Sequence, residues 1–362
     1  MGATYTYLIA DLRSGAILDE LPLSGVSFDK KLNDTGSFRA QLSVDDPEIR
    51  LREPRILTEP GRTAIYVDRD GDLLWGGIVW TSRYSAANGT LELGAADLLS
   101  YFEHRLVLDP ANLTATVPFT DVDQVEIARG LVSLAQSHPG GDLGIVFAGA
   151  ESSGVPRTVE YPASDLKPVA DALRDLANAD GGFDFTFDVR YGETGEPERF
   201  LRIGFPRLGQ PGAPYVWEYG ANLVDFTWPS DAASMATRVL AQGGAPVAED
   251  TSALRAGWPL LEAAASPSDT DNAALLAASV KGELAARRRP VVLPELTVRA
   301  DLDPVVGGYS VGDDARIVVA DPFFAGEQLD ITVRILGLEV TPGDDAGQEQ
   351  VKLTVAPFLE PS

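Results

Sequence analysis

The strongest constraint on the fold is a pair of apolar runs separated by an aspartate-glycine turn. The runs cover residues 64–67 and 73–80, and Asp70 and Gly71 lie between them. An Asp-Gly pair between strands is a strong hairpin signal, because the tight turn needs positive φ, which glycine adopts without steric cost. The segment therefore predicts an antiparallel hairpin near the N-terminus.

Further strands are predicted on both sides of this hairpin. Residues 5–9 and 38–42 alternate between apolar and polar or small side chains, and residues 90–95 also have a strand pattern. Alternation of period two gives one buried face and one solvated face. A short helix follows near 96–103, with Leu98, Leu99 and Phe102 on one side. Short strands with turns between them predict a small barrel or sandwich.

The period changes in the middle of the chain. Residues 120–123 offer a helix start, and apolar residues then recur at helical spacing up to the break at 139–141. A second helix is expected at 167–178, with Pro168 in its first turn. Alternation at 183–189 and 201–205 then predicts a hairpin with one apolar face and one solvated polar face.

The last third returns to strands around one long helix, predicted at about 269–289. Strands are expected at 296–300, 315–319, 329–338 and 351–356, and residues 242–268 read as the most loop-like part of the chain. The predicted fold class is mainly β with an α+β insertion: two small β-barrel domains flank an α/β middle. The predicted domains are an N-terminal β-barrel (1–110), an α/β insertion of two helices plus a β-hairpin (111–230) and a second β-barrel with the long helix (231–362).

Charge and composition exclude several functions. The formal net charge is −25, from 54 Asp and Glu against 29 Lys and Arg, so the surface repels nucleic-acid backbones and anionic lipid. There is no cysteine, which excludes disulfides, thiolate catalysis and cysteine-based metal sites. We expect neither a signal peptide nor a membrane span, because the N-terminal segment lacks an apolar h-region and no apolar run is long enough.

One short motif resembles a catalytic serine. Residues 308–312 match the nucleophile-elbow pattern Gly-x-Ser-x-Gly, with Ser310 at its centre. That mechanism needs a helix after the serine and a histidine later in the chain. Here a strand is expected next, and His104 and His138, the only two histidines, both precede the motif. A turn between strands is the better interpretation, and both histidines are interpreted as surface or capping residues.

Metal and sugar sites are also weakly supported. Asp68, Asp70 and Asp72 resemble the start of a calcium loop, but Leu73 and Val79 occupy the positions where an EF-hand needs Gly and Glu. Five tryptophans could stack on sugars, although packing in a core or interface explains them better: Trp75, Trp80, Trp217, Trp228 and Trp258. The sequence therefore assigns no catalytic, cofactor-binding or metal-binding residue, and we expect no cofactor and no enzymatic activity.

Several stretches resemble a known family. Residues 62–71 with 74–80, residues 24–28 with 36–38, and residues 96–102 leading to Arg105 resemble minor tail proteins of siphophages infecting actinobacteria. In the last third, the helix at 269–289, Pro290, the strand at Leu296 and the turn at 309–313 look similar to the hub proteins of contractile-tail baseplates and type VI secretion spikes.

The resemblance implies a structural subunit of the phage tail tip. It would form a homotrimeric hub ring in which each chain supplies two small β-barrels, closing the tail tube. Its implied partners are itself, a distal tail protein, the tape-measure protein and tail fibre or spike proteins. Phage DNA would pass through the channel without specific binding, and no direct membrane insertion is implied.

The implied location is the virion tail tip, after assembly in the host bacterial cytoplasm. Two alternatives stay open at this point: a receptor- or glycan-binding tail module, and a tail-associated cell-wall hydrolase.

Overall fold

The structure is a computed structural model that describes residues 3–179, 181–241, 246–265, 277, 280–284, 287, 294–324, 326, 328–343 and 349–357. It is mainly β, with 46% strand and 17% helix, which confirms that part of the predicted fold class. The chain separates into two compact units, Met1–Asp225 with Leu296–Ser362, and Phe226–Glu295. The predicted division at 110 and 230 does not coincide with this grouping and stays a prediction.

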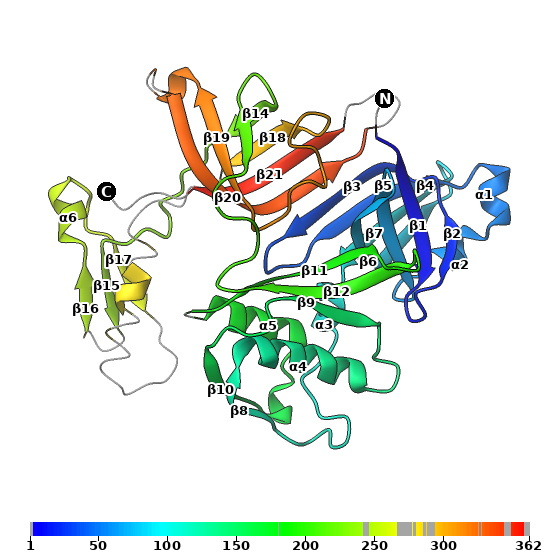
Figure 1. Ribbon diagram of the computed structural model, residues 1–362, viewed down its shortest axis with the longest axis horizontal. Helices are drawn as coiled ribbons and strands as arrows, with labels where there is room; N and C mark the ends of the chain where they lie inside the picture. The colour runs from blue at the N-terminus through cyan, green and yellow to red at the C-terminus, as the bar shows by residue number, and fades with distance from the viewer. Residues whose placement is uncertain are drawn as a thin grey trace. The chain divides into compact units, whose positions relative to one another are not determined.

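The larger unit is built on one sheet of 13 strands (Figure 1). Its main path runs β14-β18-β21-β20-β3-β4-β7-β6-β5-β1-β2, and β19, which also pairs with β13, branches from β20. The strands are β1 (Tyr5–Asp11), β2 (Ile17–Glu20), β3 (Ser24–Lys31), β4 (Ser37–Ser43), β5 (Thr63–Arg69), β6 (Asp72–Ser85), β7 (Thr90–Asp97), β13 (Tyr215–Glu218), β14 (Leu223–Thr227), β18 (Glu295–Arg299), β19 (Asp314–Ala320), β20 (Gln328–Thr341) and β21 (Gln350–Pro357).

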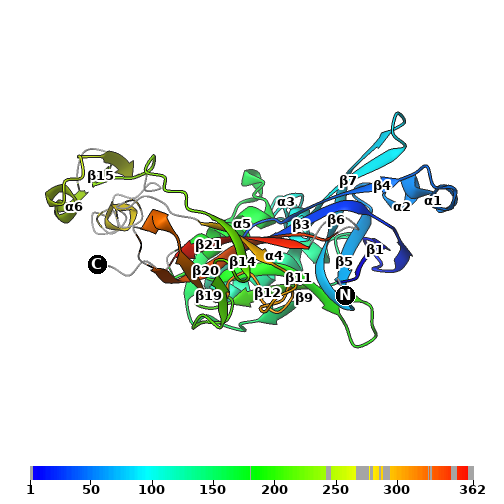
Figure 2. The ribbon, with the colours of Figure 1, turned by 90° about the horizontal axis from the view of Figure 1, so that it is seen from above.

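The hairpin predicted from the Asp-Gly turn is confirmed as β5–β6. Val67 lies opposite Trp75 in the antiparallel register, and Asp70 and Gly71 both have positive φ, 54° and 96°. Strand β4 shows the expected alternation, with every second side chain buried. At its tip, hairpin β6–β7 extends beyond β5, whereas β4 pairs with β7 as far as Thr90 (Figure 2).

The two ends of the chain meet in this sheet. Residues 337–340 of β20 pair with residues 28–31 of β3, while residues 328–334 of the same strand pair with β19. The N-terminal and C-terminal strands therefore share one hydrogen-bonded path. In the described part of the chain this path is open, from β14 to β2, so two separate closed barrels stay a prediction.

A helical layer forms the middle of the chain. Helices α3 (Leu99–Glu103), α4 (Gln124–Ser137) and α5 (Val169–Asn178) cover one face of the sheet β11 (Asp184–Tyr191), β12 (Pro197–Gly204) and β9 (Ile145–Gly149) (Figure 1). Strands β8 (Val117–Asp123) and β10 (Pro156–Tyr161) form a separate pair. The main apolar core lies here, and Phe102 of α3 stacks on Phe187 of β11 with ring centroids 5.1 Å apart.

Both predicted helices of this layer exist, with small corrections at their starts. Helix α4 begins at Gln124, because residues 117–123 form strand β8 and Asp123 is the N-cap. Pro168 is the N-cap of α5 and does not lie in its first turn. Short elements that the sequence did not predict are α1 (Pro47–Leu51), α2 (Pro54–Leu57), η1 (Ala163–Asp165) and η2 (Pro322–Phe324).

The smaller unit corrects the loop predicted at 242–268. It contains strands β15 (Arg238–Ala241), β16 (Val247–Glu249) and β17 (Glu262–Ala265) and helix α6 (Thr251–Arg255). These strands are rich in alanine, so they carry little apolar periodicity to detect. The long helix predicted at 269–289 lies mostly outside the described residues. Those that are described in this range, 277, 280–284 and 287, are helical. Among the described residues no helix is long and apolar enough to cross a membrane.

Candidate functional site

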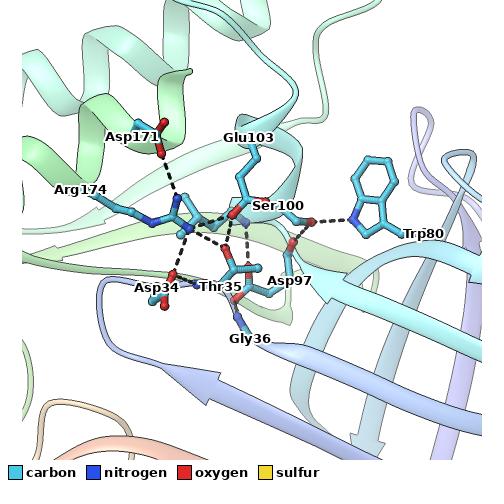
Figure 3. A network of polar contacts seen from close by, with 10 residues as sticks. Asp34, Thr35, Gly36, Trp80, Asp97, Ser100, Glu103, Asp171 and Arg174 are labelled. Carbon is cyan, nitrogen blue, oxygen red and sulfur yellow. Dashed lines mark hydrogen bonds and ion pairs between the residues drawn. The ribbon is translucent and has the colours of Figure 1, made fainter. Parts of the chain in front are cut away.

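A polar network joins the sheet to the helical layer around Arg174 of α5 (Figure 3). Its Nη2 lies 3.0 Å from Asp34 and 2.8 Å from Glu103, and it also donates to the Thr35 hydroxyl at 2.9 Å. Its Nη1 reaches Asp171 at 3.3 Å. One guanidinium thus holds the β3–β4 turn, α3 and α5 together through Nη1 and Nη2, while its Nε is buried without a hydrogen-bond partner in the described part of the chain.

Asp97, at the end of β7, is the buried carboxylate of the same network. It accepts backbone hydrogen bonds from Gly36 at 2.6 Å and Leu99 at 2.9 Å. A side chain at position 36 would lie 2.2 Å from the Asp29 carbonyl oxygen, so only glycine fits there. Burial, helped by the charges of Asp29 and Glu103, raises the pKa of Asp97 to about 7 although the two backbone bonds lower it.

A second network corrects the predicted solvated face of β11. Asp184 and Asp188, expected in water, are both buried. Asp184 accepts from Arg334 of β20 and from the Leu208 backbone at 2.9 Å, while Asp188 pairs with Lys30 of β3 at 2.5 Å. The alternating acidic residues therefore bind β11 to the strands of the large sheet.

These two networks are polar joints, by which we mean polar contacts that hold together segments far apart in the sequence. Arg199 of β12, whose side chain is only 4% exposed, forms a third joint. Its Nε donates to the Tyr66 hydroxyl at 2.7 Å, and its Nη1 donates to the carbonyl oxygens of Leu12 at 2.7 Å and Leu143 at 2.9 Å. Arg199 thus connects three segments far apart in the sequence: the β1–β2 turn, β5 and the segment that leads into β9.

A fourth joint ties β5 to the start of β21. Arg69 and Glu349 form a bidentate pair, with distances of 2.8 Å from Nε to Oε1 and 2.9 Å from Nη2 to Oε2. The Tyr5 hydroxyl donates to the same carboxylate. Bidentate geometry and low exposure make this pair stronger than an ordinary surface ion pair.

Asp123 organises the loop in front of α4. Its carboxylate accepts from the backbone of Val125, Ser153 and Gly154 at 2.7–2.9 Å and from the Ser152 hydroxyl at 2.8 Å. Burial alone would raise the pKa of Asp123, but these hydrogen bonds lower it to about 2.

We expect Asp123→Ala to lower the free energy of unfolding by about 1–2 kcal/mol at pH 7, because an N-cap acceptor and its loop contacts are lost. A depressed pKa means that the stabilisation is complete above the ordinary value of 3.8 and is lost as pH falls toward 2. Urea unfolding at pH 7 and pH 2.5 measures the difference. Glu126→Ala, which alters an exposed residue in the first turn of α4, is the control, and an equal loss there would contradict the capping role.

The structure places the predicted catalytic motif in a turn. Ser310 lies just before β19, as expected, with its hydroxyl 3.3 Å from Arg202 and its backbone bound to Asp313. The ring of His104 packs on Trp80 at 4.7 Å, and Nε2 of His138 lies 2.9 Å from the Leu108 carbonyl oxygen. The residues of a serine hydrolase are therefore not brought together by this motif.

The other sequence candidates are also occupied by structural contacts. Asp68 accepts from the Gly71 backbone and the Tyr191 hydroxyl, and Asp70 accepts from the Thr4 backbone. Across the described ranges, no group of three or more His, Asp or Glu residues is placed to hold a metal ion.

The five tryptophans differ in exposure, and Trp80 and Trp228 are half-buried. Trp75 and Trp217 are fully buried, so neither presents a face to a sugar, whereas Trp258 is 44% exposed. Trp75 stacks on Phe38 at a centroid distance of 5.3 Å, which agrees with the predicted role in a core.

Four exposed apolar residues lie on the elements at the β2 end of the large sheet. We define the edge patch as Ile17 and Leu18 of β2, Leu51 of α1 and Ile56 of α2. Leu51 is 85% exposed and Ile56 is 56% exposed. In the sheet path β2 is the terminal strand, and Arg52 after α1 donates to its Glu20 carbonyl oxygen at 2.9 Å. A terminal strand beside exposed apolar residues is typical of an interaction surface.

Sequence comparisons find no matching family model and no matching curated protein. Solved structures do match along the whole chain. A tail protein from Neisseria meningitidis matches with a TM-score of 0.64 and 18% sequence identity. The match covers 98% of this chain and 97% of the Neisseria chain. The 43 kDa tail protein of prophage MuSo2 from Shewanella oneidensis has a TM-score of 0.64 at 14% identity, covering 98% of each chain.

The prophage tail protein gp18 from Listeria monocytogenes has a TM-score of 0.54 at 11% identity, covering 96% of this chain and 94% of its own. All three proteins come from different bacteria, and each comparison covers at least 96% of this chain. The chain therefore has the fold of phage tail proteins.

Proposed function

We propose that this chain is a structural subunit of a tailed-phage tail tip, a hub that closes the tail tube. The observation that carries this proposal is the end-to-end fold match with tail proteins from Neisseria and Shewanella. An accessory domain shared between unrelated proteins would match in part only, whereas these chains correspond over nearly their full lengths. The buried polar joints fit the same role, because they fix the segments of the larger unit to one another.

The proposed assembly is a homotrimeric ring on a tail of the siphophage type, from a phage infecting actinobacteria. In this ring the N-terminal strands and the C-terminal strands of each chain would act as two barrel-like modules, so three chains would make six. The edge patch supports self-association, since apolar side chains as exposed as Leu51 are stabilised by a partner. A net charge of −25 opposes assembly, so the interface needs apolar contact or local ion pairs to offset repulsion.

The proposed neighbours are a distal tail protein on one side of the ring and fibre or spike proteins on the other. The tape-measure protein and phage DNA would pass through its channel, and acidic walls would favour passage by repelling the DNA backbone. A cryo-EM reconstruction of the virion tail tests the proposal. The hub predicts three copies at the tip, and a sixfold ring repeated along the tail, or a position away from the tip, would reject it.

The edge patch gives a direct test of assembly. We expect the purified protein to form a trimer, and Leu51→Glu combined with Ile56→Glu to give monomers, because charges would replace apolar contacts at the interface. Light scattering after gel filtration measures the mass. Leu113→Glu, which alters another exposed leucine in a loop, is the control and should remain trimeric.

The two outcomes against this prediction have different meanings. A wild-type monomer at all accessible concentrations would reject self-association as the basis of the ring. A trimer that survives the double substitution would reject the edge patch as its interface.

A further inference from the structure

The small sheet under the helical layer ends in an open strand edge at β9. Its order is β11-β12-β9, and in the described part of the chain β12 is the only strand that pairs with β9. A terminal strand directs the N–H and C=O groups of every second residue away from the sheet, where a strand of another chain can pair with them. This edge also carries exposed apolar side chains, because Val146 is 41% exposed and Phe147 is 36% exposed. Free backbone groups beside apolar side chains favour strand addition.

The first residue of β9 is bound by a side chain in place of a neighbouring strand. Gln136, in the last turn of α4, accepts from the Ile145 N–H at 2.8 Å and donates through Nε2 to the Ile145 C=O at 3.0 Å. Two residues that face each other in an antiparallel ladder exchange the same pair of hydrogen bonds. The Gln136 amide therefore occupies the position that a residue of an incoming antiparallel strand would take.

A second side chain of α4 reaches the other end of the strand. Arg129 donates through Nη2 to the Ala150 C=O at 2.6 Å, and its guanidinium lies over the Phe147 ring at 5.8 Å. The Ala150 N–H is bound on the opposite side, by the Ile203 C=O of β12 at 2.7 Å. Arg129 and Gln136 are seven residues apart, so two helical turns place them on the same side of α4. We call these two side chains the β9 cap.

The β9 cap leaves too short a length of edge for a stable ladder. The Ile145 N–H points to Gln136 and away from β12, so the alternation of the ladder directs the N–H of Phe147 away from β12 as well. An added strand needs both positions, because a single residue provides too few hydrogen bonds to hold a second chain. With Ile145 already bound by Gln136, only the backbone around Phe147 is left for pairing.

We propose that the β9 cap blocks strand addition at this edge by a second copy of the chain. Gln136 takes the first pairing position and Arg129 takes the Ala150 C=O just after the strand. An incoming strand therefore has to displace both side chains before it can form a ladder. The proposal is independent of the tail-tip assignment, since it rests on the contacts between α4 and β9 alone.

Gln136→Leu in the full-length protein tests the proposal, because leucine is of similar size and makes neither hydrogen bond. The variant is compared with wild type at a temperature where circular dichroism shows both to be folded. We expect light scattering to give the variant an average mass at least threefold that of wild type, rising with protein concentration, because the freed edge pairs with other copies. An average mass equal to that of wild type at every concentration would overturn the proposal.

Two further variants separate an opened edge from a weakened fold. Val132→Ala removes fully buried contacts of the same helix but keeps the β9 cap, so it should have the average mass of wild type. Adding Phe147→Pro to Gln136→Leu should restore the wild-type mass, because proline lacks the N–H that an added strand needs. Association of Val132→Ala as strong as that of Gln136→Leu, or persistent association of the double variant, would contradict the assignment.

Hydrogen exchange tests the cap without requiring a variant to associate. In wild type the amide of Ile145 should exchange at least tenfold more slowly than the amide of Phe147, because Gln136 holds only the first of the two. Gln136→Leu should remove this difference. Equal exchange of the two amides in wild type would mean that the Gln136 hydrogen bonds do not persist in solution. A difference that survives in Gln136→Leu would assign the protection to burial of Ile145, and either result would overturn the proposal.

Discussion

The variant Arg199→Met is expected to lose about 3 kcal/mol of the free energy of unfolding. Methionine fills much of the space but donates nothing, so the Leu12 and Leu143 carbonyl oxygens and the Tyr66 hydroxyl each lose a partner. Each buried group left without a partner costs about 1–3 kcal/mol. Removing a buried cation recovers part of this loss, which is why the expected total is at the lower end of the sum.

The physical reason for so large an effect is the position of Arg199. The arginine is on β12, and its three acceptors come from the β1–β2 turn, β5 and the segment before β9. No single neighbouring segment can replace the lost bonds, because each acceptor lies on a different part of the chain. Loss of this residue therefore loosens the attachment of the helical layer to the N-terminal strands.

Urea unfolding followed by tryptophan fluorescence measures the effect. Arg190→Met is the matched control: the residue is on the partner strand β11, exposed, and paired with Glu198 at 2.5 Å. Exposed pairs contribute about 0–1 kcal/mol, so the control should stay close to wild type. Equal free energies of unfolding for the two variants would show that the buried hydrogen bonds of Arg199 stabilise the protein no more than an exposed ion pair does.

Local sequence patterns predicted the elements whose signals lie within a few residues. The β5–β6 hairpin follows from its Asp-Gly turn, and β4 follows from strict alternation, because turn geometry and a period of two are properties of adjacent residues. Helix α5 follows from apolar spacing in the same way. Each prediction needed only its own segment of the chain.

The joints could not be predicted in this way. Asp184 has the spacing of a solvated face, and its burial becomes visible only when Arg334, 150 residues later, is placed beside it. The pairing of β3 with β20 joins the first and last thirds of the chain, and no periodicity encodes such a pairing. A charged residue that alternates with aromatic neighbours is compatible with a solvated face and with a buried ion pair. Whether it is buried therefore depends on whether the fold places a partner beside it.

Titration of Asp97 is expected to lower the free energy of unfolding as pH rises from 5 to 8, and Asp97→Asn should remove this contribution. The pKa of Asp97 is about 7 in the folded state against 3.8 ordinarily. Between these values the folded protein holds a proton that the unfolded chain has released, so raising the pH favours unfolding. The difference over this interval is about 2–3 kcal/mol, since each pKa unit corresponds to about 1.4 kcal/mol.

The measurement is a double difference: urea unfolding of wild type and Asp97→Asn, each at pH 5 and pH 8. Asparagine resembles the protonated carboxyl in shape and charge. The free energy of unfolding of the variant should therefore be closest to that of wild type at pH 5, and it should increase relative to wild type at pH 8. Asp72→Asn, at the exposed start of β6, controls for the change in net charge. Parallel pH profiles for wild type and Asp97→Asn would mean that Asp97 keeps its charge in the folded state. In that case the two backbone hydrogen bonds from Gly36 and Leu99 would outweigh the burial of the carboxylate.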